Sequence, residues 1–443
     1  MKQDTGRLGQ WAIAMAVLST FVNTAWGQKG DEGVQSGPMI GHVSHRSVQL
    51  WIQTNHSADV QIKYSASNSN EFRQSDKIRT ESENAFVAQF QLEELEPGTT
   101  YDVDFLVDGK ALSESVTVNT QVLWDWRMDP PAFKFVTGSC AYINEEAYDR
   151  PGKPYGGGYE IFEHMAGESP DMMLWLGDNI YLREVDFQSY GGFLHRYTHT
   201  RSTPEMAELL KTCPNYAIWD DHDFGPNDSD GSWIHADWSK QAFETFWCNP
   251  SYGLPEAPRC ISTAFRFVDM EFFLLDNRTY RVNHYNKTNE PQVLGEEQID
   301  WLIQALRNSR APFKFVVVGG QVLSDAMVYE NVAQFPSERQ QILDRIEAED
   351  IRGVVFLSGD RHTTELSEIT LSNGRKVYDL TVSPLTSGTG HAKDEPNSFR
   401  VEGTYVEQRN YAVLSFDGPR KNRTCTIEVK GTDGTLLWNR QLD

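Results

Sequence analysis

The stretch WDDHDFGPND at residues 219–228 places four aspartates, a histidine and an asparagine within ten positions. Carboxylates this close repel one another, and burying them is costly unless a positive group compensates their charge. The apolar residues YAI come directly before Trp219, so the cluster begins where a buried segment ends. The pattern therefore predicts that the cluster holds a cation.

A calcium loop of the EF-hand type does not explain this cluster. Such a loop needs ligands at its first, third and fifth positions and glycine at its sixth. Counting from Asp221 places Gly225 at the fifth position and Pro226 at the sixth, and counting from Asp228 places Trp233 at the sixth. The sequence therefore favours a metal site assembled from several separate segments.

Three further apolar stretches end in residues that can bind metals. FKFVTGSC ends at Cys140, MMLWLGDNIY delivers Asp178 and Tyr181, and VVFLSGDRH delivers Asp360 and His362. Each apolar run is typical of a strand buried on both faces of a sheet. Ligands of open α/β sheets bind outside the carboxyl ends of the strands, so these side chains are expected to meet on one rim.

The elements that must position these residues follow two patterns. Residues 34–122 contain short alternating runs separated by turns, and LEPGTTYDVDF is typical of a fibronectin-type β-sandwich. After Pro130 and Pro131, apolar strands alternate with helical stretches, which predicts a layered α/β domain at 132–443. Within it, EEQIDWLIQALRN places four apolar residues on one helical face.

The chain of 443 residues is strongly acidic, with 63 Asp and Glu against 40 Lys and Arg. Such a surface repels nucleic acid and anionic membranes, so neither is expected as a partner. It also repels phosphate esters, and an enzyme acting on them needs a local positive centre. A metal site within the acidic cluster meets that need.

The N-terminus has the features of an export signal. Lys2 and Arg7 precede the apolar run WAIAMAVLSTFV, and the small-residue site AWG ends at residue 27. The run is shorter than a spanning helix needs, so no membrane span is expected in the mature chain. We therefore expect a signal peptide at residues 1–27 and a periplasmic or secreted protein.

Exported proteins form disulfides, and this chain has five cysteines. Cys248 and Cys260 flank a loop rich in proline and glycine and are expected to pair. Cys140 is expected to remain unpaired because it stands at a strand end among metal-binding residues.

The stretches TGSC, LGDNIY, WDDHD, LLDNRTYR and LSGDRH occur in this order along the chain. With these motifs the chain resembles the alkaline phosphatase D-like metallophosphoesterases, from the β-sandwich to near the C-terminus. The resemblance implies a four-layer α/β/β/α sandwich preceded by a small fibronectin- or immunoglobulin-like β-sandwich. It also implies ferric iron and calcium as cofactors and phosphate mono- and diesters as substrates.

The resemblance implies an iron site at the strand ends. Asp178 would bridge the two metals, and Cys140 and Tyr181 would bind iron, with His362 as a further ligand. A thiolate and a tyrosinate are strong electron donors, which together favour a highly charged ion such as ferric iron. The donors Cys, His and Asp also suit zinc, so zinc stays a rival of iron at this site.

The resemblance implies a calcium site beside the iron site. Asp221 and Asp360 supply hard oxygen donors, which suit calcium and also magnesium or manganese. His222 would lie beside the scissile phosphate, where it can stabilise developing charge or protonate the leaving oxygen after attack by a metal-bound hydroxide. Asn179 and Arg361 are further candidates for holding the substrate.

Two positions depart from the family pattern, because Asn179 stands where an aromatic or other residue is usual and Asp223 replaces the more usual glutamate. Asp220 is expected to contact a metal ligand and not the metal itself, since adjacent residues on a strand point to opposite faces. Arg278 and Arg281 are interpreted either as phosphate-binding residues or as partners in ion pairs.

Two alternative functions stay open. A phosphodiesterase or phospholipase D-type enzyme uses the same ligands, because metal ligands do not choose between one and two ester groups. A calcium-stabilised surface binding protein needs neither a histidine in the acidic cluster nor Tyr and Cys at strand ends. The sequence leaves the oligomeric state open. It predicts an exported metal-dependent phosphoesterase with a small phosphate ester as its substrate.

Overall fold

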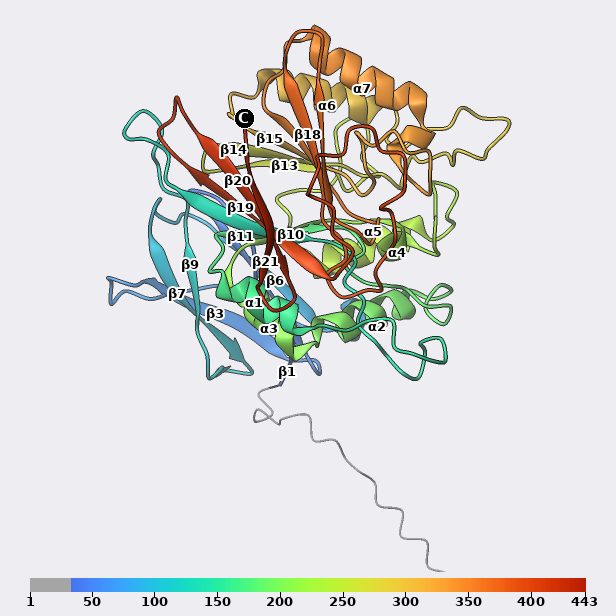
Figure 1. The fold of residues 1–443 in the computed structure, drawn as a ribbon. Helices are drawn as coiled ribbons and strands as arrows, with labels where there is room; N and C mark the ends of the chain where they lie inside the picture. Colours follow the sequence, from blue (N-terminus) through green and yellow to red (C-terminus); the bar gives the residue numbers. More distant parts are fainter. Residues whose placement is uncertain (1–32) are drawn as a thin grey trace, which may run out of the picture. The chain divides into compact units, whose positions relative to one another are not determined.

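Two six-stranded sheets lie face to face within residues 133–443 (Figure 1). The structure is a computed structural model, and it describes residues 33–443. The predicted signal peptide at residues 1–27 lies outside the described residues and stays a prediction. No helix within residues 33–443 has the length and apolar character that crossing a bilayer requires.

The first sheet has the strand order β12-β11-β10-β19-β20-β21. Strands β10, β11 and β12 run parallel, so their carboxyl ends lie at the same edge of the sheet. The remaining strands extend the sheet in antiparallel fashion. The bounds are β10 Phe133–Gly138, β11 Met172–Leu176, β12 Asn215–Ile218, β19 Asn410–Asp417, β20 Thr424–Gly431 and β21 Leu436–Leu442.

The second sheet has the strand order β13-β14-β15-β16-β18-β17. Its four inner strands β14, β15, β16 and β18 run parallel, and the two outer strands pair with them in antiparallel fashion. The bounds are β13 Thr263–Phe267, β14 Met270–Leu274, β15 Lys314–Val317, β16 Val354–Ser358, β17 Glu365–Thr370 and β18 Lys376–Thr381.

The alternation of side chains along each strand builds three apolar layers. On β11, Leu174 and Leu176 point into the core between the sheets, whereas Trp175 points to the helices on the outer face. On β14, Phe272 packs between the sheets and Phe273 packs against the other helical layer. Both faces of each strand are therefore buried, as the continuous apolar runs in the sequence predict.

Helices cover the outer faces of both sheets, which confirms the predicted α/β/β/α layers. Figure 1 shows α6 and α7 together beside the strands of the second sheet. The predicted face of α6 (Ile299, Leu302, Ile303 and Leu306) is buried. The bounds are α1 Glu160–Gly167, α2 Tyr190–Arg201, α3 Pro204–Thr212 and α5 Ala236–Phe246 on the first sheet, and α6 Glu296–Asn308 and α7 Pro336–Ala348 on the second.

The predicted N-terminal β-sandwich is also present, with one sheet ordered β1-β2-β6 and another ordered β4-β3-β7-β8, to which β5 and β9 add. Apolar side chains of the two sheets form a core of their own. Residues 120–132 follow without a helix or strand. The bounds are β1 Val34–Val43, β2 Val48–Thr54, β3 Asp59–Ala66, β4 Arg73–Gln74, β5 Ile78–Arg79, β6 Val87–Leu92, β7 Thr100–Val107, β8 Lys110–Ala111 and β9 Val116–Asn119.

The β-sandwich packs directly against the first sheet and its helices. The indole of Trp51 on β2 is buried and donates a hydrogen bond to the carbonyl of Thr245 on α5 at 2.9 Å. His42 on β1 contacts Tyr216 on β12, with its Nδ1 3.1 Å from the tyrosine Oη. The sandwich therefore supports the strand that leads into the WDDHD motif.

The prediction of a Cys248–Cys260 disulfide is wrong, because both side chains are free thiols. Cys248 is buried in the core beneath the first sheet, where it lies against Gly41 of the β-sandwich. Cys260 is buried in a separate small cluster, and its Sγ donates a hydrogen bond to the carbonyl of Ala257 at 3.0 Å. Packing into two different cores separates the two thiols, although the loop between them is short.

Candidate metal centre

Four polar residues follow four strand ends at the same spacing. Cys140, Asp178, Asp220 and Asp360 each stand two residues beyond the ends of β10, β11, β12 and β16. Cys140, Asp178 and Asp360 have positive φ values of 62°, 51° and 62°. Such left-handed conformations cost about 1–3 kcal/mol each in residues other than glycine, and they concentrate at functional sites. The local backbone is therefore strained where the sequence predicts metal ligands.

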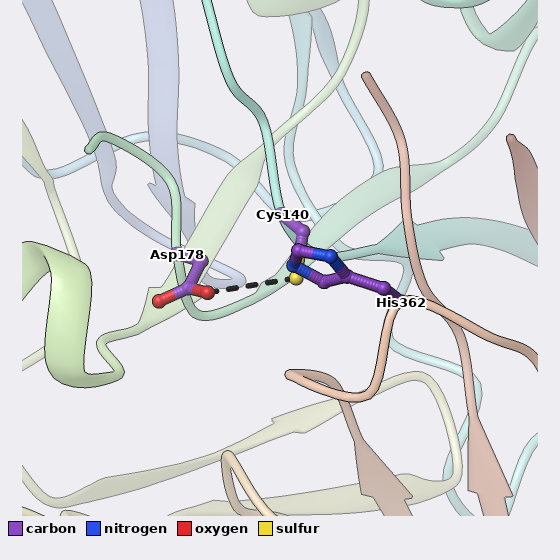
Figure 2. Close-up of side chains that lie close together, drawn as sticks. All are labelled: Cys140, Asp178 and His362. Carbon is purple, nitrogen blue, oxygen red and sulfur yellow. Dashed lines mark hydrogen bonds between the residues drawn. The ribbon is translucent and has the colours of Figure 1, made fainter. Parts of the chain in front are cut away.

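Cys140, Asp178 and His362 point toward one another from three separate loops (Figure 2). The Cys140 Sγ lies 3.5 Å from Asp178 Oδ2, and the Tyr181 hydroxyl donates to the same oxygen at 3.1 Å. His362 Nε2 lies 3.3 Å from the Tyr181 hydroxyl. Ligands about 2.1 Å from a common ion at tetrahedral angles lie roughly 3.4 Å apart, so the spacing of these four donor atoms fits one metal ion.

A second group of donors lies beside the first. Ligand atoms of Asp178, Asp221 and His222 lie within 4.8 Å of one another, as do those of Asp220, Asp221 and Asp360. The two oxygens of Asp178 face different partners, because Oδ2 faces Cys140 while Oδ1 accepts the backbone N–H of His222 at 3.3 Å. Asp178 therefore stands between the two groups, where a bridging ligand belongs.

Arg278 compensates the charge of the carboxylates at this site only in part. Burial raises the pKa of Asp178 and of Asp360 well above the usual range, and the neighbouring acidic groups raise it further. Asp220 Oδ2 and Asp221 Oδ1 are buried without a hydrogen-bond partner. Carboxylate oxygens that bind a hard cation are expected to be buried and without a hydrogen-bond partner when the cation is absent. The donor set therefore fits a two-metal centre.

Arg278 is the buried counter-charge behind this centre. Its Nε donates to Asp220 Oδ1 at 2.6 Å, and its two terminal nitrogens donate to the Glu330 carboxylate at 3.1 and 2.6 Å. Arg281 forms a second ion pair with Glu330 at 2.6 Å. The two arginines are thus engaged in ion pairs, and Arg278 holds Asp220 behind Asp221.

Asn179 is placed away from the cavity above the centre. Its side-chain nitrogen donates to the carbonyl of Ile218 at 2.8 Å and to Asp223 Oδ1 at 3.0 Å. Asp223 in turn accepts the backbone N–H of Asp220 at 2.9 Å and caps the short helix α4 (Asp221–Phe224). This geometry favours a structural role for Asn179, in which it links two loops of the site, and does not favour the predicted contact with substrate.

A cavity of about 460 Å³ is lined by several of the candidate metal ligands, among them Asp178, Asp221 and Asp360. Arg361 lines it and is held by Glu395, whose two oxygens lie 2.7 Å from one guanidinium nitrogen. The Arg361 guanidinium also lies 4.6 Å from the ring centre of Tyr329. His222 lines the same cavity, and its ring centre lies 4.2 Å from that of Tyr181.

Two further residues at the site, Glu330 and Tyr155, are not predicted by the sequence. Glu330 lies in a loop that carries no recognisable motif, yet it reaches both the cavity and Arg278. The hydroxyl of Tyr155 lies 3.1 Å from His362 Nδ1, where it fixes the orientation of that ring. A separation of 207 positions in the chain leaves no local signal for this second contact.

Comparison with known proteins gives one family for the region that carries these residues. A family model described as PhoD-like phosphatase matches residues 135–421, and a domain of unknown function matches residues 31–121. Alkaline phosphatase D of Bacillus subtilis (strain 168) is 22% identical over 325 residues, which are 61% of this chain and 54% of that protein. The chain thus spans about half the length of this curated relative.

Solved structures show the same fold. The structure of PhoD superposes with a TM-score of 0.75 at 16% identity, covering 94% of this chain and 93% of the other. The purple acid phosphatase PPD1 from yellow lupin (Lupinus luteus) seeds superposes with a TM-score of 0.68 at 11% identity, covering 91% and 73%. Because the family match spans well over half of the sequence, the chain belongs to the PhoD-like phosphatase family.

Proposed function

We propose that this protein is a metal-dependent phosphoesterase that hydrolyses phosphate mono- or diesters. The observation that supports this most strongly is the convergence of thiol, phenol, imidazole and carboxylate donors from four strand ends beside one cavity. Membership of a phosphatase family points in the same direction. Such a donor set offers no advantage to a purely structural protein, because burying these charges costs stability.

In this proposal Cys140, Asp178, Tyr181 and His362 hold ferric iron. Bound metals supply positive charge that stabilises the transferring phosphoryl group, and they lower the pKa of water. The thiol and phenol must lose their protons on binding, although burial raises the pKa of both Cys140 and Tyr181 well above the usual range in the metal-free protein. Metal binding and deprotonation are therefore coupled at this site.

Asp221 and Asp360 hold the second cation, for which calcium is proposed, and Asp178 is shared. Carboxylate oxygens are the ligands that calcium prefers. The positive charge of the two ions also offsets the acidic surface that otherwise repels a phosphate ester. We propose that Arg361 adds a hydrogen bond to the phosphate, because its side chain lines the cavity.

His222 is the proposed general acid. It lines the cavity, and its backbone is fixed by the hydrogen bond to Asp178. Burial lowers the pKa of its imidazole, although nearby Asp221 acts in the opposite direction. As a general acid His222 would react as the imidazolium, which the Asp221 carboxylate favours, and would pass its proton to the developing alkoxide.

A phosphodiesterase or phospholipase D-type activity is the second candidate, favoured by the size of the cavity. Its volume of about 460 Å³ lies within the range of pockets that hold whole organic ligands. Tyr155 and Tyr329 form part of its wall, so an organic group beside the phosphate meets aromatic surface.

Rates on a nitrophenyl phosphate monoester and on a bis(nitrophenyl) diester test the proposal, with the metal content measured on the same samples. On an alkyl phosphate, whose leaving alkoxide needs a proton, His222→Ala should lower turnover by about 10²–10⁴-fold without metal loss. His391→Ala is the matched control, because His391 also lines the cavity but is exposed. Loss of metal in His222→Ala would show that His222 is a metal ligand. Wild-type rates of this variant on a substrate with a poor leaving group would show that His222 is not the general acid.

A further inference from the structure

The segment after β18 is fixed against the loop that carries Cys140. The backbone N–H of Leu385 donates to the carbonyl of Ser139 at 2.8 Å, and that of Ser387 donates to the carbonyl of Cys140 at 3.1 Å. These bonds join backbone groups 246 or 247 positions apart in the chain. Because the two segments are tied through their backbones, their relation does not depend on which side chains bind metal.

Ser383 lies in this segment between two of the proposed iron ligands. It is completely buried, its Oγ lies 3.1 Å from the Cys140 Sγ, and the same oxygen accepts the backbone N–H of His362 at 2.9 Å. These are the two hydrogen-bond partners of this oxygen among residues 33–443. A hydroxyl has one hydrogen to donate, and an N–H cannot accept it, so the hydrogen points to sulfur. Ser383 is therefore the donor and Cys140 the acceptor.

Ser139 provides an internal comparison. Its Oγ lies 3.5 Å from the same sulfur, but its hydrogen is used by the carbonyl of Val382 at 2.8 Å. Two buried serines thus flank Cys140, and only Ser383 has a hydrogen available for the sulfur.

Neighbouring elements hold Ser383 in place. Its backbone N–H donates to the Thr364 hydroxyl at 3.0 Å, and its carbonyl accepts from the Asn410 side chain at 3.2 Å. Asn410 begins β19 of the first sheet, whereas Thr364 directly precedes β17 of the second. The hydroxyl is therefore positioned by both sheets.

We propose that Ser383 is a positioning residue of the iron site, where its hydroxyl donates a hydrogen bond to the Cys140 thiolate. A hydrogen bond to the charged form of a ligand favours that form. Hydrogen bonds to a metal-bound sulfur also reduce its electron donation and tune the metal. This inference rests on the proposed function, because it requires iron at Cys140.

The test compares the full-length variants Ser383→Ala, Ser383→Thr and Ser139→Ala with the wild type, all purified with iron and calcium present. Iron per chain, iron retention against a competing chelator and the visible absorption band are measured. Ser383→Ala should lower iron affinity by about 10–100-fold, the usual effect of removing an outer partner of a ligand. Its sulfur-to-iron charge-transfer band should move to longer wavelength, because a sulfur without this hydrogen bond is a stronger donor. Ser383→Thr and Ser139→Ala should resemble the wild type.

The outcomes separate this inference from the proposed function. If the wild type contains iron and Ser383→Ala keeps both its affinity and its band, the inference is wrong and the phosphoesterase proposal stands. If the wild type contains no iron yet hydrolyses phosphate esters with another metal, the iron assignment and this inference both fail. Should Ser383→Ala not fold, Ser383→Cys gives the comparison, because its thiol is a weaker donor of similar shape and should cause a smaller shift.

Discussion

Replacing Arg278 with methionine should destabilise the metal-free protein strongly. The Arg278 side chain is 1% exposed and pairs with Asp220, also 1% exposed, and with Glu330, 7% exposed. Removing one partner of a buried ion pair costs about 3–5 kcal/mol, because the remaining charge is left uncompensated. Arg278 serves two carboxylates, but Glu330 retains its ion pair with Arg281. We therefore expect a loss of about 4 kcal/mol in the free energy of unfolding.

Urea unfolding monitored by tryptophan fluorescence measures this loss on chelator-treated protein, so that metal affinity does not contribute. Arg307→Met is the matched control, because Arg307 forms an exposed ion pair with Glu349 at 3.3 Å and should lose at most about 1 kcal/mol. Adding Asp220→Asn to Arg278→Met should recover part of the loss, since it removes the unpaired charge. A loss below about 1 kcal/mol in Arg278→Met would refute the claim that this arginine compensates the acidic cluster.

Three other predictions concern metal removal, colour and acid stability. Removal of calcium by a chelator should stop hydrolysis reversibly, because Asp221 and Asp360 then repel each other; full rates after confirmed metal loss would contradict this. Tyr181→Phe should bleach or strongly shift a visible band of the iron-containing protein, whereas a colourless, active zinc enzyme would exclude iron. Burial lowers the pKa of His42 from 6.5 to about 4, so the unfolded chain takes up a proton first as the pH falls. The contribution of His42 to stability should therefore fall by about 3 kcal/mol between pH 6.5 and 4, and urea unfolding of His42→Gln should lack that contribution.

The sequence predicts the layered fold because short-range rules determine it. Apolar runs such as those of β11 and β16 must be buried on both faces, and the spacing of Ile299, Leu302, Ile303 and Leu306 allows only one buried helical face. The meeting of Cys140 and Asp178 is predictable for the same reason, since parallel strands bring their carboxyl ends to one edge of a sheet. Asp360 follows β16 of the second sheet and approaches Asp220 and Asp221 from there, so pairing within one sheet does not explain its position.

Contacts between loops are not predictable in this way. Glu330, Tyr155 and Ser383 reach the site from segments without a periodic pattern, and their partners lie far away in the chain. The expected Cys248–Cys260 disulfide fails because closeness in sequence says nothing about which core each thiol enters. Substrate contact by Asn179 is expected only from its place in the motif. In the structure its side-chain nitrogen donates hydrogen bonds to the carbonyl of Ile218 and to Asp223.

The metal content and hydrolytic rate of Asp178→Asn test the two-metal account most directly. Asp178 faces Cys140 through one oxygen and His222 through the other, so it is the ligand on which both sites depend. The wild type should contain iron and calcium and hydrolyse phosphate esters, and Asp178→Asn should lose both metals and the activity while remaining folded. An Asp178→Asn protein that keeps its full complement of metals and turns over at the wild-type rate would contradict the account.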